Sequence, residues 1–372
     1  MLTSGINLIN FKKKIKTSAA KTKLVSLIKE KNHILDSLKK DYKNNFNKKR
    51  LKIFKKTINF RVIGMGGSIL GTQAIYDFLR YKIKKNFFFV DNLQQKLIRN
   101  KKKNLTNLII SKSGNTIETI VNANILIKKK EKNIFITENN NNYLHSLAKK
   151  LKAEIVHHNN FIGGRYSVLS EVGMLPAELM GLNSSDFKVF NNLIKSKKFI
   201  NALVSSVSST VHFIKKKKYN SIIINYDQKS ENLFKWYQQL IAESLGKNKK
   251  GLLPIVSNMP KDNHSVMQLY LEGARNNFFT FFYVKDKNSD KINNSSLLAS
   301  RSFLENKDTD KIIFAQKKAT EKVFTMKKIP FRSFEIKYRN EKTLGELFTF
   351  FILETILIGN LLRLNPYNQP AV

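Results

Sequence analysis

Short runs of β-branched and aromatic residues alternate with stretches of helical periodicity from about residue 58 onward. The runs are Phe60–Ile63, Phe87–Val90, Leu108–Ile110 and Ile134–Thr137, and helical spacing follows Ser68, Thr116 and Tyr143. Strands that alternate with helices along a chain form parallel sheets whose faces the helices cover. The alternation therefore predicts an α/β fold with parallel sheets flanked by helices.

The alternation pauses between residues 186 and 218, which are helical in pattern and rich in Lys and Ser. It then resumes in a similar order. The predicted strands are Ile222–Ile224, Leu252–Val256, Phe278–Val284 and Phe331–Ile336, and the predicted helices are Glu231–Leu245 and those that start at His264, Asp310 and Leu344. We predict an exposed loop at Lys285–Ser296. We predict two related α/β units, a first domain over residues 51–185 and a second domain over residues 186–372.

The first 50 residues follow a different pattern. Their apolar side chains recur at helical spacing, at Leu24, Leu27, Ile28, Ile34, Leu35 and Leu38. This spacing predicts one or two amphipathic helices that pack on the rest of the chain. We therefore predict an N-terminal helical segment over residues 1–50.

Composition narrows the class of protein. The 372 residues include no cysteine, which excludes disulfides and thiolate metal sites, and only 6 histidines, so we predict no metal site.

The 67 Lys and Arg residues outnumber 27 Asp and Glu residues, which gives a formal charge of +40. Such a charge suits nucleic acid, a membrane surface or a phosphorylated small molecule. Runs such as Lys128–Lys130 and Lys215–Lys218 fall where turns or helix ends are expected, so we interpret them mainly as solvated faces.

The most apolar stretch, Leu347–Leu362, is shorter than the roughly 20 residues of a membrane span and contains Glu354. We expect no membrane contact, a cytoplasmic location and no specific nucleic-acid partner. Aromatic side chains interleaved with lysines along one groove would instead favour nucleic acid.

Two loops after predicted strands have the chemistry of phosphate binding. Gly64, Gly66 and Gly67 precede Ser68, and glycines between a strand and a helix let the backbone approach an anion. This loop lacks the third glycine of a dinucleotide fingerprint, so it equally suits close packing of strand and helix. The second loop runs from Ser111 to Glu118 and is more specific.

The second loop places the hydroxyls of Ser111, Ser113 and Thr116, together with Lys112 and Gly114, at the start of a helix. Hydroxyl and N–H donors at a helix N-terminus suit a phosphate dianion. Helix capping by Thr116 is the alternative, but a cap accounts for one hydroxyl only.

Three further positions carry candidate acid, base and electrophile groups. Arg165 follows Gly163 and Gly164, where a guanidinium could hold an oxyanion, although a structural salt bridge is the simpler alternative. Gln239 and Glu243 lie four residues apart and share a helix face, with Glu243 in partly apolar sequence surroundings. His264 is placed at a helix start, where a cap or a packed side chain is more common than a catalyst.

Taken in order, these segments resemble the glucose-6-phosphate isomerase family. The resemblance runs from about residue 60 to the end and rests on Gly66-Gly67-Ser68, Ser111–Glu118, Gly163–Ser167, Gln239 with Glu243 and Ser244, Lys261–His264 and Asn365–Pro370. It implies two flavodoxin-like sugar-isomerase domains, a homodimer with active sites at the subunit boundary, and no cofactor. It also implies reversible conversion of glucose 6-phosphate to fructose 6-phosphate through an enediolate, in glycolysis and gluconeogenesis.

The resemblance also implies roles for single residues. Ser111, Lys112, Ser113 and Thr116 would hold the phosphate, and Gly67 and Ser68 would line the sugar. Glu243 would move a proton between C1 and C2, Arg165 would stabilise the enediolate, and His264 of the neighbouring subunit would help to open the ring. Gln239 and Gln369 would position the substrate.

One departure from the family concerns the C-terminus. In the family a further stretch carries a lysine that contributes to ring opening, whereas this sequence stops at Val372. We expect intact phosphate-binding and enolisation groups with weakened ring opening. A sugar-phosphate-binding protein without turnover, and an isomerase that also accepts mannose 6-phosphate because Ser113 replaces a common threonine, stay open as alternatives.

Overall fold

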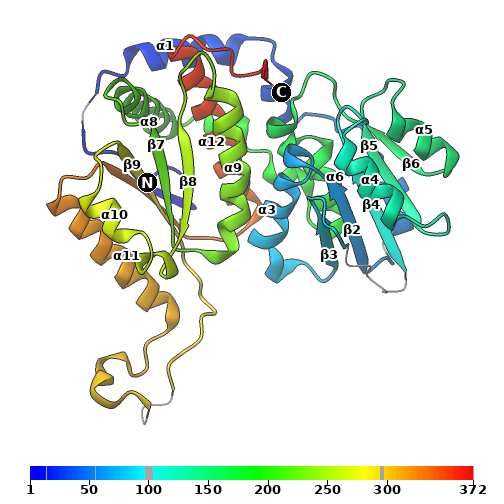
Figure 1. Ribbon diagram of the computed structural model, residues 1–372. Helices are drawn as coiled ribbons and strands as arrows, with labels where there is room; N and C mark the ends of the chain where they lie inside the picture. Colours follow the sequence, from blue (N-terminus) through cyan, green and yellow to red (C-terminus); the bar gives the residue numbers. More distant parts are fainter. Residues whose placement is uncertain (14, 55, 97–103, 294–296, 372) are drawn as a thin grey trace.

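The computed structural model describes residues 1–13, 15–54, 56–96, 104–293 and 297–371, so Val372 and the end of the predicted loop Lys285–Ser296 lie outside the described residues. The molecule has two halves, each built on a five-stranded sheet with helices packed on it, and the helices α3 (Leu70–Phe78) and α9 (Glu231–Leu245) lie side by side where the halves meet (Figure 1). The predicted fold class, two mostly parallel sheets flanked by helices, is confirmed.

The first sheet has the strand order β3-β2-β4-β5-β6, and every neighbouring pair is parallel. This is the flavodoxin-like order, in which the chain turns in opposite directions after its first two strands. The strands are β2 (Asn59–Gly64), β3 (Asn86–Val90), β4 (Leu105–Ile110), β5 (Lys132–Thr137) and β6 (Glu154–His157), and the helices besides α3 are α4 (Ile117–Leu126), α5 (Tyr143–Lys150) and α6 (Glu171–Met180).

The second sheet has the order β1-β10-β9-β7-β8, parallel except for β1, which pairs antiparallel with β10. Its strands are β1 (Ile6–Ile9), β7 (Asn220–Asn225), β8 (Leu253–Asn258), β9 (Asn277–Val284) and β10 (Phe331–Ile336). Besides α9, its helices are α1 (Ser18–Lys29), α2 (His33–Ser37), α7 (Phe190–Leu193), α8 (Lys197–Lys215), α10 (Met267–Glu272), α11 (Thr309–Met326) and α12 (Glu341–Leu361).

Alternate residues of each strand face opposite layers, as the pleat of a strand requires. In β7, Ile222 and Ile224 pack with α10 and α11, whereas Ile223 joins a large core that contains α8, α9 and α12. In β4, Ile109 packs with α4 and α5, and Leu108 belongs to the same large core. That core lies between the two sheets and therefore fixes the halves relative to each other.

The N-terminal segment is helical only in part. Helices α1 and α2 form at the predicted apolar spacing, and Leu24, Leu27 and Leu35 are buried. The prediction missed β1, whose Ile6 pairs with Ile336 at the edge of the second sheet. The separate domain boundaries at residues 51 and 186 stay a prediction.

The length argument against a membrane span was wrong. Helix α12 begins at Glu341, and by length and composition it could cross a membrane. However, 89% of its most apolar window is buried inside the fold, and it packs on α8 and α9. Glu354 is buried there too, where it accepts a hydrogen bond from Arg332 Nη2 at 3.0 Å, so α12 has the properties of a core helix.

Candidate active site

The predicted loops meet at the carboxyl ends of β2 and β4. Gly64 at the end of β2 stands opposite Ile110 at the end of β4, so the loops that follow them start side by side. In a sheet of this strand order, ligands bind at this edge, where the chain direction switches. Local strand pairing thus places both candidate phosphate loops at the usual ligand position of the fold.

In the second loop the hydroxyls point toward one another. Ser111 Oγ and Thr116 Oγ1 share a hydrogen bond of 2.8 Å, and the Gly114 N–H donates to Ser111 Oγ at 3.2 Å. Thr116 precedes α4 but makes no capping hydrogen bond to it, so the capping alternative does not describe this side chain. The N-terminus of α4 therefore has no side-chain cap from Thr116.

Gly114 fixes the shape of this loop. Its φ is +68°, and a Cβ at this position would lie 1.9 Å from Asn142 Oδ1. Only glycine avoids both the left-handed backbone strain and this clash. Lys112 at the rim pairs with Glu138 at 3.3 Å, and Ser113 is exposed.

The first loop joins the two halves of the molecule. Gly66 has a φ of +50°, and a Cβ there would lie 2.7 Å from Gln239 Nε2 on α9. Gly67 packs so closely on the backbone of Gly164 that a Cβ would lie 2.2 Å from its carbonyl carbon. The glycine loop thus brings Ser68, Gln239 and the Arg165 segment together.

Arg165 is almost fully buried and its guanidinium is held on several sides. Nε donates to Ser244 Oγ at 2.8 Å, and Nη2 donates to the carbonyl oxygens of Pro366 at 2.7 Å and Asn368 at 3.2 Å. The remaining nitrogen, Nη1, donates to Glu243 Oε2 at 3.3 Å. Such anchoring leaves one edge of the planar group facing the carboxylate.

Glu243 accepts hydrogen bonds from several polar donors. Oε1 accepts from Gln239 Nε2 at 2.7 Å, and Oε2 accepts from Gln369 Nε2 at 2.6 Å as well as from Arg165. The side chain is 26% exposed, and Gln369 is exposed. The predicted residues Arg165, Gln239, Glu243 and Gln369 thus form one cluster.

His264 is separate from this cluster. It is exposed, it ends a 3₁₀ turn (Lys261–Asn263) after β8, and helix α10 begins only at Met267. Among the described residues, no hydrogen bond or ion pair links its side chain to Glu243 or Arg165. Within one chain, the structure does not bring His264 to the other predicted residues.

Several groups that support the cluster had no predicted role, although Tyr166 and Ser244 lie in segments that carry the family resemblance. Ser244 and Tyr166 share a hydrogen bond of 2.8 Å, and the Trp236 indole donates to the Arg165 carbonyl at 3.1 Å. Lys247 donates to the Asn365 carbonyl at 2.5 Å, and burial, followed by the charge of Arg165, lowers its pKa. The position of Ser244 directly after Glu243 on the same predicted helix was the available signal.

The resemblance to the glucose-6-phosphate isomerase family is confirmed by comparison with known proteins. The family described as phosphoglucose isomerase matches residues 17–372. The chain therefore belongs to the phosphoglucose isomerase family.

Individual relatives agree. A glucose-6-phosphate isomerase of Methanocaldococcus jannaschii is 33% identical over 84% of this chain and 81% of its own length. One from Mycoplasmopsis pulmonis is 30% identical over 90% of this chain and 86% of its own length. These identities extend over both halves of the molecule.

Solved structures share the fold at lower identity. A hypothetical protein from Thermus thermophilus matches with a TM-score of 0.82 and 20% identity over 96% of this chain and 92% of that chain. A glucose-6-phosphate isomerase from Chlamydia trachomatis matches with a TM-score of 0.69 and 15% identity over 95% of this chain and 75% of that chain. At these identities the likeness is one of fold.

Proposed function

We propose that this chain interconverts glucose 6-phosphate and fructose 6-phosphate through an enediolate. The observation that carries the proposal is the contact between a carboxylate and a buried guanidinium, Glu243 and Arg165 at 3.3 Å, beside a glycine loop that adjoins a hydroxyl-lined loop. The named relatives are isomerases of this substrate, which favours this reaction over a binding protein without turnover.

The hydroxyl loop would hold the phosphate. Ser111, Ser113 and Thr116 supply hydroxyls, Lys112 supplies a cation, and the N-terminus of α4 supplies N–H groups. Gly67 and Ser68 lie between this loop and α9 and would line the sugar. A phosphate fixed at one end orients the reacting carbons at the other end.

Glu243 would act as the base. Its carboxylate removes the proton from C2 of the open-chain aldose and returns it to C1, while the hydroxyl proton moves from O2 to O1. Negative charge develops on the oxygen atoms in between, and the guanidinium of Arg165 faces that charge. Because the guanidinium is anchored beforehand, its reorganisation costs little during the reaction.

Substrate binding requires a free carboxylate oxygen. Both oxygens of Glu243 accept hydrogen bonds, from Gln239, Gln369 and Arg165. Gln369 is exposed near the chain end, whereas Gln239 lies on α9 against the glycine loop. We infer that Gln369 releases Glu243 when substrate enters and then donates to a substrate hydroxyl.

The decisive experiment is a coupled assay of fructose 6-phosphate conversion. We expect Glu243→Gln to lower kcat about 10³-fold, within the range of general-base contributions. Glu231→Gln, which lies on the same helix and pairs only with Lys235 among the described residues, is the matched control and should retain activity. Full activity in Glu243→Gln would refute the role of Glu243.

His264 would complete the site from a second copy of the chain. Its exposed position away from the Glu243 cluster suits a residue that acts across a subunit boundary. There it would exchange a proton with the ring oxygen and so open the cyclic sugar. The proposal requires a homodimer.

Mixing inactive variants tests this arrangement. A heterodimer of Glu243→Gln and His264→Ala chains contains one intact site if His264 acts across the boundary, so random exchange should restore about a quarter of wild-type activity. If both residues act within one chain, every site in the mixture has a defect and no activity returns.

Two finer predictions remain attached to this function. Acceptance of mannose 6-phosphate is measured in the same assay with Ser113→Thr as the comparison. A cytoplasmic location is expected for an enzyme of this substrate.

A further inference from the structure

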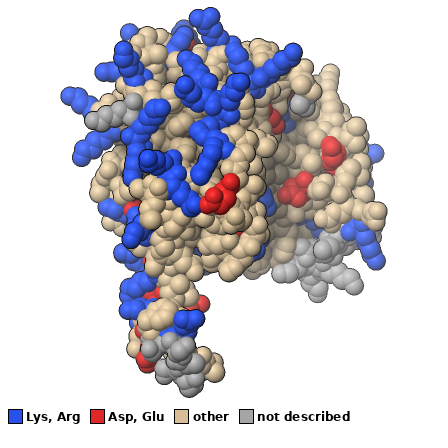
Figure 2. All heavy atoms as spheres, turned by 60° about the vertical axis from the view of Figure 1, so that its left-hand side comes forward, with Lys and Arg blue, Asp and Glu red and all other residues tan. Residues whose placement is uncertain are grey.

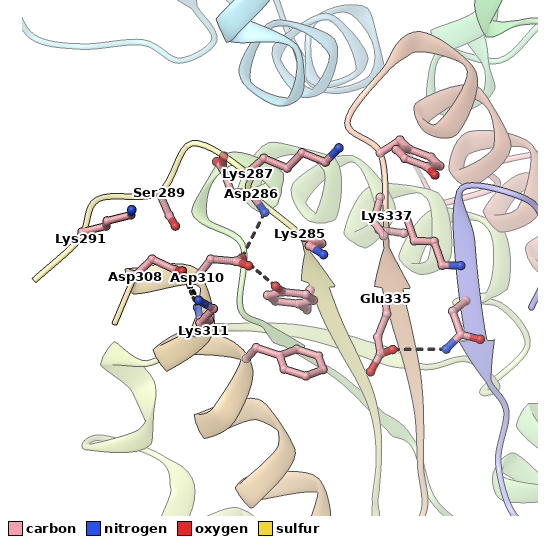
Figure 3. A pocket seen from close by; sticks show the side chains of 15 residues that line it. Lys285, Asp286, Lys287, Ser289, Lys291, Asp308, Asp310, Lys311, Glu335 and Lys337 are labelled. Atoms are coloured by element: carbon pink, nitrogen blue, oxygen red, sulfur yellow. Dashed lines mark hydrogen bonds and ion pairs between the residues drawn. The ribbon is translucent and has the colours of Figure 1, made fainter. Parts of the chain in front are cut away.

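A cavity of about 800 Å³ lies in the second half, away from the Glu243 cluster. It opens at the carboxyl ends of β9 and β10, beside the start of α11 (Figure 3). Asp286 in the cavity wall pairs with Lys229, which lies just before α9. Glu243 lies 12 residues beyond the start of α9, which corresponds to roughly 18 Å along the helix axis. The cavity and the Glu243 cluster are therefore near opposite ends of α9. Its volume is in the range of small-molecule sites.

The wall of the cavity is fixed by backbone hydrogen bonds. The Thr309 N–H donates to the Asp290 carbonyl at 2.8 Å, and the Ile292 N–H donates to the Lys307 carbonyl at 2.9 Å. These bonds close the long loop at its base. The Lys285 N–H donates to the Ile336 carbonyl at 2.9 Å, which ties the other side to β10.

The carboxylates around the cavity already have partners. Asp286 pairs with Lys229 at 3.0 Å, and Asp308 pairs with Lys311 at 3.1 Å. Glu335 pairs with Lys317 at 2.8 Å and also with Lys318. Only Asp310 lacks a cation among the described residues, and it accepts from the Tyr283 hydroxyl at 2.7 Å.

Four lysines of the lining have no such compensation. Among the residues that the structure describes, none forms an ion pair with Lys285, Lys287, Lys291 or Lys337. Figure 3 shows Lys291 coming from the loop on one side and Lys337 from the end of β10 on the other. Unpaired lysines are common on a chain of charge +40, but here four of them line one cavity.

Aromatic rings supply the apolar part of the lining. Phe314 is partly buried and packs on the Tyr283 ring with centroids 5.0 Å apart. Tyr338 is 51% exposed at the rim. A flat ring system can stack on such side chains while ammonium groups hold phosphates.

We propose that this cavity binds a nucleoside triphosphate, with its phosphates among the four lysines and its base against the exposed ring of Tyr338. A sugar monophosphate carries one phosphate and no flat ring. It would therefore leave most of the four lysines without a phosphate partner and would not stack on the aromatic lining. The site is distinct from the proposed isomerase site and does not depend on that function.

The test is calorimetric titration of the full chain with ATP at 0.15 M NaCl. Lys287→Gln with Lys337→Gln should weaken ATP binding at least tenfold. The matched control, Lys215→Gln with Lys216→Gln, removes the same charge from exposed lysines outside the cavity lining and should change ATP binding less than twofold. Equal weakening by both pairs, or no saturable binding by the wild type, would overturn the proposal.

Two further arms locate the ligand. Tyr338→Ala should weaken binding of ATP but not of tripolyphosphate, because only ATP has a base to stack. Fructose 6-phosphate at saturating concentration should leave ATP binding unchanged. Displacement of ATP by fructose 6-phosphate would place the nucleotide in the isomerase site and so refute the cavity as its site.

Discussion

The orientation of Arg165 depends on a residue that never needs to touch substrate. Ser244 Oγ accepts from Arg165 Nε and shares a second hydrogen bond with the Tyr166 hydroxyl, both at 2.8 Å. Ser244→Ala should therefore lower kcat about tenfold with little change in KM, because the guanidinium loses its fixed direction toward the enediolate. The coupled assay over a range of fructose 6-phosphate concentrations measures both constants.

Ser209→Ala is the control, because it removes the hydroxyl of a buried serine that does not contact Arg165. Ser209 is 1% exposed on α8, and both substitutions should cost about 1 kcal/mol of unfolding free energy. A merely structural role for Ser244 would give equal stability losses and an unchanged kcat in both variants.

For single residues, the sequence predicts which side chains carry the chemistry better than it predicts which groups hold those side chains in place. The hydroxyls of Ser111 and Thr116 and the carboxylate of Glu243 have chemistry that is visible in the residue letters. The carbonyl oxygens of Pro366 and Asn368 that hold Arg165 could not be predicted in this way, because every residue has a carbonyl group. These contacts also join positions about 200 apart in the chain. The role of His264 stays a prediction, because the proposed site needs a second copy of the chain.

Among the elements, the turn before α4 gives the sharpest prediction. Gly114→Ala should raise KM at least tenfold with a smaller change in kcat, since its Cβ would meet Asn142 at 1.9 Å and displace the hydroxyl loop. Gly181→Ala is the matched control, because Gly181 also has a positive φ, +91°, but its Cβ would meet nothing within 4 Å. It should cost about 1 kcal/mol of stability and leave KM unchanged.

A second prediction concerns the packing of the N-terminal segment near α6. Lys188 is 5% exposed, its Nζ lies 4.2 Å from the centre of the Tyr42 ring, and burial lowers its pKa to about 7, opposed by the charges of Glu171 and Asp41. Between pH 7 and 10.5 the unfolded chain therefore binds a proton that the folded chain does not. The contribution of Lys188 to stability is most unfavourable below pH 7 and improves as the pH rises through this window.

Lys188→Met should remove this dependence. We expect the variant to be more stable than the wild type by about 1–3 kcal/mol at pH 6.5, with the difference shrinking toward pH 10. Urea unfolding at several pH values measures it, and the exposed Lys195→Met serves as control. A difference that stays constant with pH would show that Lys188 is protonated in the folded chain throughout.

The elements themselves follow the sequence where apolar residues recur at the regular spacing of a strand or a helix. Strand β10 and helix α9 have the predicted bounds. Strand β1 was missed because four residues at a sheet edge, with only Ile6 fully buried, carry almost no local pattern. The start of α12 was misplaced because its first turn, from Glu341, is polar and resembles a loop.

At the scale of the whole molecule, the excess of lysine is unevenly distributed. Figure 2 shows Lys and Arg side chains gathered over the side that carries the second sheet. A basic face is defined here by exposed residues that lie near Phe213 and His212, namely Lys12, Lys13, Lys215, Lys216, Arg275, Lys327 and Lys328. The charges of Lys13, Lys215 and Lys216 add to burial in lowering the pKa of His212, which indicates a positive potential there.

A net charge of +40 should attract a dianionic substrate from a distance. We expect kcat/KM for fructose 6-phosphate to fall about fivefold between 0.02 and 0.3 M ionic strength, while kcat changes little, because salt screens the approach and not the bound complex. Replacing Lys12, Lys13, Lys215 and Lys216 with Gln separates the basic face from charges at the site. If the basic face contributes, kcat/KM of the variant depends less steeply on ionic strength than kcat/KM of the wild type. An unchanged slope would assign the whole effect to groups beside the phosphate, such as Lys112. The basic face would then be only a solvated surface.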